Sequence, residues 1–207
     1  LWGMYSAGAR TMYGYPFPDG LRKNSPLAEP IVTPTTKARH GGHDEPLSPA
    51  AVVERGLLPA ELWDEVTAAA LAVFRRGVEI GERAGLILAD TKYEFGLVTD
   101  VDGEHVILID ELHTPDSSRW WVAASYDERL AAGAEPESLD KEVVRRAYAD
   151  LGYKGDGPPP TLPGEVWTAT AARYIDAFER LTGTALVPGS YPVDERLDAN
   201  LRRAGLL

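Results

Sequence analysis

Residues 86–99 read LILADTKYEFGLVT, and residues 100–112 continue as DVDGEHVILIDEL. The first stretch is rich in β-formers that alternate with polar side chains, which predicts one strand over 86–99. Asp102-Gly103 is a strong turn signal, and the apolar run over 105–112 predicts the return strand. The centre of the chain is therefore expected to form an antiparallel β-hairpin.

The two faces of the first predicted strand differ in polarity. Alternation places Asp90, Lys92 and Glu94 on one face. The opposite, core-facing set is Ile87, Ala89, Thr91, Tyr93, Phe95 and Leu97. A solvated face with offsetting charges is the simpler interpretation of the polar set. Two features favour a functional one: the polar face continues into Leu86 and Leu88, and the return strand supplies another acid.

The register of the hairpin decides which acid faces Glu94. A two-residue turn at 102–103 pairs Glu94 with Glu111, whereas a three-residue loop over 101–103 pairs it with Asp110. We prefer the second register, because it places the isoleucines of the return strand on the core face. Glu94 and Asp110 then form an oxygen-only carboxylate site, which suits Mg²⁺ bound together with phosphate oxygens.

A second polar segment, TPDSSRWW at residues 114–121, follows the hairpin. Pro115 ends the strand, and Asp116 or Ser117 can cap a short helix. Helix-start N–H groups, two hydroxyls and the guanidinium of Arg119 together suit a phosphate. An ordinary capped turn explains these residues equally well, and the position after an acid-lined hairpin favours the phosphate.

The rest of the chain predicts helices, short strands and one long loop. Apolar and small residues recur at helical spacing over 59–84, and further helices are expected over 139–151 and 163–182. Turns and short strands are expected over residues 1–30, and a polar loop over 33–48 ends at a helix-starting Ser-Pro pair. The absence of strict βαβ alternation favours an α+β fold in which helices pack on an antiparallel sheet.

Composition excludes several classes of protein. The 207 residues carry a net charge of −11, which argues against a non-specific nucleic-acid binder. The absence of cysteine excludes disulfides and thiolate chemistry, and no apolar run reaches the ~18 residues of a membrane span. The four histidines show no metal-binding spacing. We expect a soluble, cytoplasmic globular protein, with one lobe over 1–138 and a helical segment over 139–207.

Several long motifs resemble one enzyme family. Residues 88–96 (LADTKYEFG) are similar to a signature of the SAICAR synthetases, although that family usually has Phe at the position of Tyr93. Residues 110–121 (DELHTPDSSRWW), 29–45 and 174–183 resemble three further stretches of the same family, in the same order. The resemblance covers nearly the whole chain.

The resemblance implies a fold, an activity and ligands. It implies a SAICAR synthetase-like catalytic lobe related to the ATP-grasp enzymes. The implied reaction is the ATP-dependent ligation of L-aspartate to carboxyaminoimidazole ribonucleotide in purine biosynthesis, giving SAICAR, ADP and phosphate. ATP and Mg²⁺ are the implied cofactors. The implied partners are small-molecule substrates, without nucleic acid or membrane, and the family also permits homo-oligomers.

The resemblance also implies roles for individual residues. Glu94 and Asp110 match the carboxylates that hold the Mg²⁺-nucleotide, as metal and cofactor ligands. Asp90 and Lys92 match catalytic positions in contact with the imidazole nucleotide, and Asp116 matches a further contact to that substrate.

Three further positions complete the implied site. Ser118 and Arg119 resemble a clamp for the substrate's 5′-phosphate, and Lys37 is a candidate contact for an anionic substrate. The chain starts at Leu1, after the region where the family carries a glycine-rich nucleotide lobe, so we expect a fragment that lacks this lobe. The alternatives are a paralogue that forms an amide on another acceptor in secondary metabolism, and an inactive nucleotide-binding fragment.

Overall fold

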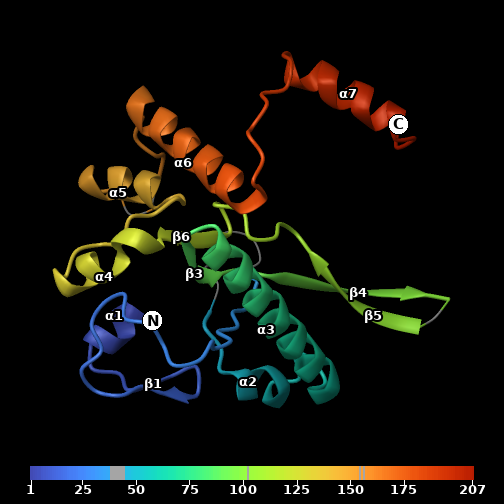
Figure 1. Cartoon of the computed structure of the whole chain (residues 1–207). Coiled ribbons are helices and arrows are strands. Elements are labelled where there is room, and N and C mark those ends of the chain that lie inside the picture. The colour runs from blue at the N-terminus through green and yellow to red at the C-terminus, as the bar shows by residue number, and fades with distance from the viewer. Residues whose placement is uncertain (38–44, 102, 154, 156) are drawn as a thin grey trace.

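The chain folds into helices and small antiparallel sheets (Figure 1). The computed structural model describes residues 1–37, 45–101, 103–153, 155 and 157–207. The helices are α1 (Trp2–Ser6), α2 (Pro49–Glu54), α3 (Ala60–Arg83), α4 (Ala123–Ala131), α5 (Glu142–Asp150), α6 (Gly164–Thr182) and α7 (Val193–Arg203). The strands are β1 (Thr11–Met12), β2 (Tyr15–Pro16), β3 (Leu86–Thr91), β4 (Glu94–Asp100), β5 (Gly103–Ile109) and β6 (Ser118–Val122). The expected α+β class is confirmed, and within the described ranges no helix is long and apolar enough to cross a membrane.

Helix α3 matches the helix predicted over 59–84 to within one residue at each end. Its buried face carries glycine at positions 77 and 81, where large rings lie against the helix. A Cβ atom on Gly81 would lie 2.6 Å from the ring of Trp120, and one on Gly77 would lie 2.2 Å from the ring of His113. Glycine is required at both positions because the rings occupy the space of a side chain.

The main core is built on the β3–β6 pair. Its buried members are Leu86, Leu88, Trp120, Val122, Leu139 and Ala177. Phe74 and Val78 of α3 and Leu181 of α6 pack against this cluster. The segment beyond residue 138 therefore shares its core with the central strands.

The single strand predicted over 86–99 is wrong, because the chain forms two strands in two different sheets. Strand β3 pairs with β6, and β4 pairs with β5. The break falls at Lys92, whose backbone N–H donates to the carbonyl of Ser117 at 3.1 Å. The short helix considered after Pro115 is also wrong from Ser118 onward, because residues 118–122 pair with β3 as a strand.

A β-bulge reverses the faces of β3. Leu88 pairs with Trp120, but Asp90 pairs with Arg119, so Ala89 is an extra residue opposite β6. An extra residue shifts the alternation by one position, so every later side chain changes face. The buried leucines consequently face the core while Asp90 faces the other side. The expectation that the polar face continues into those leucines was wrong.

The β4–β5 hairpin adopts neither of the two expected registers. Asp100 pairs with Gly103, and Glu94 pairs with Ile109. The turn is displaced toward the N-terminus relative to both expectations, and Gly103 accommodates it with a φ of +119°. Asp110 therefore does not lie opposite Glu94. It follows the end of β5 with a left-handed φ of +68°.

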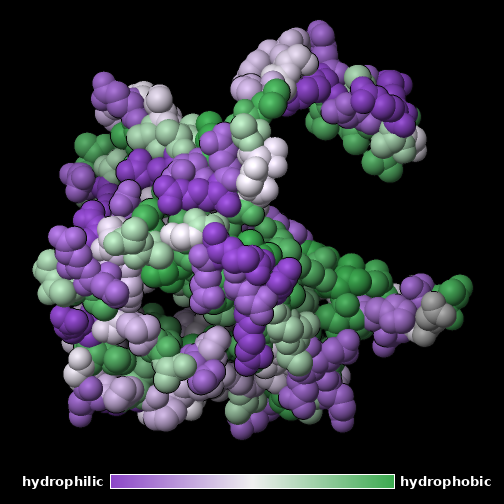
Figure 2. Space-filling model, in the orientation of Figure 1, coloured by the Kyte–Doolittle hydropathy of each residue, from purple (hydrophilic) through white to green (hydrophobic). Residues whose placement is uncertain are grey.

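The hairpin extends away from the body of the molecule (Figure 1). Leu97, Ile107 and Ile109 were expected in the core, but they keep 48%, 39% and 40% of their exposure. The expectation was wrong because the core lies on the β3–β6 pair, whereas β4 and β5 pair only with each other. Figure 2 shows the resulting hydrophobic surface along the hairpin. Residue 102 of the expected turn lies outside the described residues.

The N-terminal segment has its own small core. Its buried members are Tyr5, Met12 and Phe17. Turns and short strands were expected over residues 1–30 and are present, with β1 and β2 paired antiparallel, whereas α1 was not expected. Lys23 and Asn24 both donate to the Glu135 carboxylate, and the Tyr126 hydroxyl donates to the carbonyl of Asn24 at 2.6 Å. These contacts attach the segment to the region of α4.

The loop expected over 33–48 is described only in part, since residues 38–44 lie outside the described residues. Thr35 forms an isolated antiparallel bridge with Pro46. The expected cap is confirmed: the Ser48 side chain accepts a hydrogen bond from the N–H of Ala51 at 3.1 Å and starts α2.

The C-terminal helices agree with the sequence pattern to different degrees. Helix α6 occupies the stretch expected over 163–182 and ends at Gly183, which has a φ of +67°. Helix α5 begins at Glu142 rather than at Leu139, because the Asp140 carboxylate accepts the N–H of Glu142 at 2.8 Å. Helices α4 and α7 were not expected.

Candidate functional site

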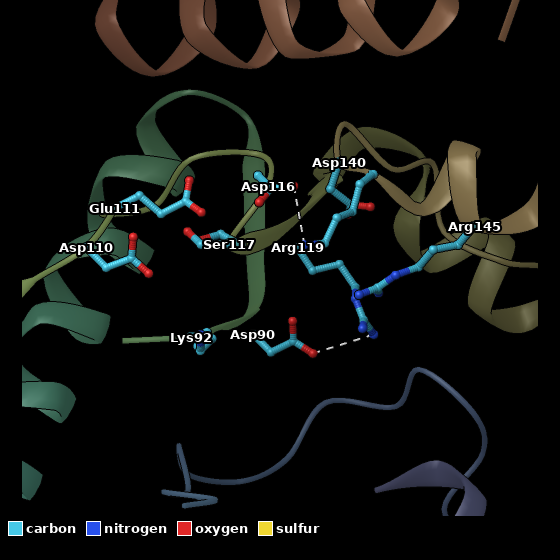
Figure 3. Close-up of a pocket in the computed structure, with 11 residues that line it drawn as sticks. Asp90, Lys92, Asp110, Glu111, Asp116, Ser117, Arg119, Asp140 and Arg145 are labelled. Carbon is cyan, nitrogen blue, oxygen red and sulfur yellow. Dashed lines mark hydrogen bonds and ion pairs between the residues drawn. The ribbon is translucent and has the colours of Figure 1, made fainter. Parts of the chain in front are cut away.

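A polar cleft of about 230 Å³ lies where β3, β5 and β6 meet the start of α5 (Figure 3). It is lined by Asp90, Lys92, Asp110, Glu111, Asp116, Ser117, Ser118, Arg119, Asp140, Lys141 and Arg145. Five carboxylates, four cationic side chains and two hydroxyls therefore face one space. A ligand that carries both anionic groups and hydrogen-bond donors suits such a lining.

The bulge in β3 brings Asp90 and Arg119 together in the cleft. They are cross-strand partners, and Arg119 Nη1 lies 3.5 Å from Asp90 Oδ2. Burial by the cleft walls raises the pKa of Asp90, and the positive charge of Arg119 opposes this rise. The side chain of Asp90 nevertheless keeps 59% of its exposure, so an entering ligand can reach it.

The segment before α5 runs beside β6. Ser138 pairs with Trp121 in an isolated antiparallel bridge, and the N–H of Leu139 donates to the carbonyl of Trp120 at 2.9 Å. This pairing places the next two residues, Asp140 and Lys141, at the edge of the cleft. Figure 3 shows Asp140 on the same side of the cleft as Arg145, near Arg119.

An ion pair crosses the cleft between this segment and the turn before β6. Lys141 Nζ lies 3.3 Å from Asp116 Oδ1, although 25 residues separate them. Both side chains are partly exposed. Tyr174 of α6 lies close enough to the acids for them to affect it: burial raises the pKa of its phenol, and so do the charges of Asp116 and Asp140.

The serine of the expected phosphate clamp lies at the inner wall of the cleft. Ser118 is 3% exposed, and its hydroxyl forms hydrogen bonds with Thr91 at 2.8 Å and with Ser117 at 3.4 Å. The hydroxyls thus join β3 to β6 beneath the cleft. Arg119, on the next position of β6, presents its guanidinium to the cleft.

Two adjacent carboxylates occupy the opposite end of the cleft in Figure 3. Asp110 leaves β5 in the left-handed conformation, and Glu111 accepts a hydrogen bond from the Thr114 hydroxyl. Across the parts of the chain that are described, no group of three or more His, Cys, Asp and Glu side chains is arranged to hold a metal ion. A pair of carboxylates still suits Mg²⁺ when phosphate oxygens supply further ligands.

His113 anchors the loop over 110–117 to the core. Its ring lies against Gly77 and contacts the Tyr93 hydroxyl through Nε2, and its carbonyl accepts a hydrogen bond from Trp120 Nε1 at 3.0 Å. Burial lowers the pKa of His113 and raises that of Tyr93. At neutral pH this contact therefore joins an uncharged imidazole to an uncharged phenol.

Glu94 and Lys37 lie outside the cleft lining and pair with each other. Lys37 Nζ donates to Glu94 Oε2 at 3.0 Å, and Lys92 Nζ donates to Glu94 Oε1 at 2.5 Å. The hydrogen bonds from the two ammonium groups, first that of Lys92, lower the pKa of Glu94 to about 2. Because each oxygen already accepts from a lysine, a metal ion at Glu94 would compete with the two ammonium groups for the same oxygens.

Comparison with known proteins identifies the family. The family model described as SAICAR synthetase matches residues 3–160. The chain belongs to the SAICAR synthetase family. A phosphoribosylaminoimidazole-succinocarboxamide synthase of Legionella pneumophila (strain Paris) is 45% identical over 207 residues, covering 98% of this chain and 64% of the relative.

Solved SAICAR synthetases share the fold. The SAICAR-synthase from Saccharomyces cerevisiae complexed with SAICAR has a TM-score of 0.73 and 34% identity, covering 90% of this chain and 57% of that chain. A SAICAR synthetase (Type-2) in complex with ADP has a TM-score of 0.57 and 26% identity, covering 81% and 57%. The chain spans 58% to 64% of the length of four curated relatives that are 45% to 50% identical to it.

The cleft brings together most of the positions matched to the SAICAR synthetase motifs. Six of the expected site residues line it: Asp90, Lys92, Asp110, Asp116, Ser118 and Arg119. The other two, Lys37 and Glu94, form their own ion pair outside the lining. Five lining residues had no role implied by the family resemblance: Glu111, Ser117, Asp140, Lys141 and Arg145. Ser117 was considered as one of the two hydroxyls that suit a phosphate, and Glu111 as an alternative partner of Glu94. The other three carry only the weak signal of charges around a helix start.

The Glu94→Gln variant is expected to lose at most about 1 kcal/mol of unfolding free energy at pH 7, because Lys37 is 83% exposed and solvent weakens the pair. The pKa of Glu94 is lowered by folding, so its stabilisation is complete above the ordinary value of 4.5 and declines as the pH falls toward 2. Urea denaturation at pH 7 and at pH 3 should therefore show a smaller difference from the unsubstituted chain at pH 3. Glu104→Gln, an exposed acid on the same hairpin, is the control. A difference for Glu94→Gln that grows with acidity would contradict the assignment.

Proposed function

We propose that the protein acts in the SAICAR synthetase reaction, joining L-aspartate to carboxyaminoimidazole ribonucleotide at the expense of ATP. The observation that supports this proposal best is the convergence of six motif residues on a single mixed-charge cleft. The purine substrate is favoured over another acceptor, because the curated relatives with 40% to 45% identity over nearly the whole chain carry the name of this synthase. A cytoplasmic location, and small molecules rather than nucleic acid or membrane as partners, are part of the proposal.

The chemistry requires activation of a carboxylate and then its capture by an amine. Transfer of the γ-phosphoryl group of ATP to the substrate carboxylate releases ADP and leaves an acyl phosphate. The amine of L-aspartate attacks the acyl carbon, the C–O bond to phosphate breaks, and the nitrogen loses a proton. The site must therefore hold an anionic nucleotide, accept a proton and stabilise a leaving phosphate.

The cleft residues suit these tasks. Arg119, with the neighbouring Ser118, binds the 5′-phosphate of the imidazole nucleotide, since a guanidinium makes charge-assisted bonds to phosphate. Asp90 accepts the proton from the attacking amine, for which its raised pKa is appropriate. The ammonium group of Lys92 stabilises the negative charge of the leaving phosphate, and Asp116 contacts the imidazole nucleotide.

Mg²⁺, when bound, neutralises the phosphate oxygens of ATP and orients them for transfer. Asp110 is the residue of the cleft expected to hold it, together with Glu111 beside it. Glu94 is ionised down to about pH 2, and a metal ion that it joined in holding would compete with its lysine partners. Lys37 then becomes available for an anionic substrate.

Calorimetric titration of the 207-residue chain with SAICAR tests the proposal. Saturable binding with a stoichiometry of one is expected, whereas adenosine monophosphate, which shares the ribose and phosphate, should bind more weakly. ADP with Mg²⁺ is titrated separately. Product formation from ATP, L-aspartate and carboxyaminoimidazole ribonucleotide is then followed by mass spectrometry. The proposal fails if SAICAR does not bind, and binding of SAICAR without turnover would leave the inactive nucleotide-binding alternative as the function.

A further inference from the structure

Asp140 is the one buried carboxylate that lines the described part of the cleft. Asp140 is only 3% exposed, and it lies between Ser138, which pairs with β6, and the start of α5. Its neighbours in the lining, Asp90 and Asp116, have partly exposed side chains. Burial makes the hydrogen bonds of Asp140 energetically important, because a buried charged oxygen has lost its contacts with water.

The two oxygens of Asp140 have different surroundings. Oδ1 accepts the N–H of Glu142, the first residue of α5, at 2.8 Å and thereby satisfies one of the free N–H groups at the helix start. Oδ2 is buried and has no hydrogen-bond partner among the described residues. Three cations of the cleft are already engaged elsewhere, since Lys141 pairs with Asp116, Arg119 with Asp90 and Arg145 with Glu142. An unsatisfied buried oxygen beside a cleft points to a donor that the ligand supplies.

We propose that Asp140 Oδ2 accepts a hydrogen bond from a donor of the bound nucleotide, either a ribose hydroxyl or an amino group. Phosphates and carboxylates of the ligand have no such donor at neutral pH, and they are attracted to Arg119 and Arg145 instead. Asp140 is thus a binding and specificity residue that fixes which edge of the nucleotide enters the cleft. The inference rests on the proposed function and deepens it.

The Asp140→Asn variant tests this role while keeping the fold. Asparagine also caps helices well, and the N–H of Glu142 requires its carbonyl oxygen at the cap. The amide NH₂ group must then point to the position of Oδ2, where a donor meets the donor of the ligand. The affinity for SAICAR should fall roughly ten- to a hundredfold. The melting temperature of the free chain should be unchanged or raised, because an unpaired buried charge has been removed.

Asp127→Asn, the same chemical change on the exposed surface of α4, is the matched control and should bind SAICAR like the unsubstituted chain. The 2′-deoxy and 3′-deoxy analogues of SAICAR separate the two donors. If the partner is a ribose hydroxyl, the effect of Asp140→Asn disappears with the analogue that lacks it. If the effect persists with both analogues, the partner is an amino group.

The outcomes separate this inference from the proposed function. If the unsubstituted chain binds SAICAR and Asp140→Asn binds it equally well, the inference is overturned while the proposed function stands. A lower melting temperature together with unchanged affinity would assign Asp140 to capping alone. If the unsubstituted chain does not bind SAICAR, the proposed function is overturned and the inference with it.

Discussion

Trp120→Ala is expected to lower the free energy of unfolding by about 3–5 kcal/mol. The indole is only 1% exposed and lies against Gly81 and Leu86 at the centre of the main core. Its removal leaves a cavity that the paired strands cannot close by relaxation. It also removes the donor to the carbonyl of His113, so a partly buried acceptor loses its partner.

Urea denaturation followed by far-ultraviolet circular dichroism measures this loss. Trp167→Ala on α6 is the matched control, because that indole is 51% exposed and should cost less than about 1 kcal/mol. Equal losses for the two variants would contradict the assignment of the core to the β3–β6 pair. A destabilised Trp120→Ala chain should also bind SAICAR more weakly, since the loop anchored by His113 carries residues of the cleft.

Arg119→Ala is expected to weaken SAICAR binding by about 2–3 kcal/mol, which corresponds to a roughly 30- to 150-fold rise in Kd. The substitution removes the guanidinium proposed to hold the 5′-phosphate. In the unsubstituted chain the carboxylate of Asp90 lies 3.5 Å from Arg119 Nη1, and the substitution leaves it without this cross-strand partner. An unpaired carboxylate repels an entering phosphate, so both consequences act in the same direction. Calorimetry at one fixed ionic strength measures the change.

The dephosphorylated nucleoside of SAICAR makes this experiment specific. It should bind the unsubstituted chain and Arg119→Ala with similar affinity, because the contact to phosphate is absent in both. Arg180→Ala, which removes an arginine paired with Asp176 on α6 outside the cleft lining, is the control and should leave the affinity for SAICAR unchanged. An equal loss of affinity for the nucleoside and for SAICAR would show that Arg119 does not contact the phosphate.

Local sequence signals predicted the helices that depend on one continuous row of apolar residues or on one capping residue. The apolar row of α3, the Ser48 cap of α2 and the glycine that ends α6 were all found where the pattern placed them. Strand faces could not be predicted in this way, because one bulged residue, Ala89, inverts every side chain after it. The hairpin register likewise depended on where Gly103 takes its positive φ, which two-residue and three-residue loops both permit.

The candidate site was predictable to the extent that its residues are close in sequence. Asp90 and Arg119 stand in motifs on either side of the hairpin, and cross-strand pairing brings them together. Asp140, Lys141 and Arg145 reach the cleft through the pairing of residue 138 with β6, a long-range contact that no local pattern specifies. The side of the cleft that holds Asp140 therefore follows only from the three-dimensional structure.

The two cores also set an order of events during synthesis. The N-terminal cluster draws only on residues 5–31, so it can form as soon as this segment has left the ribosome. Its attachments to the region of α4 join residues 102 to 112 positions apart. At translation rates of about 5–20 residues per second, the segment waits on the order of ten seconds for its partner. During that interval the Asn24 carbonyl and its neighbours face solvent, and a nascent chain stalled before Tyr126 would present them to other molecules.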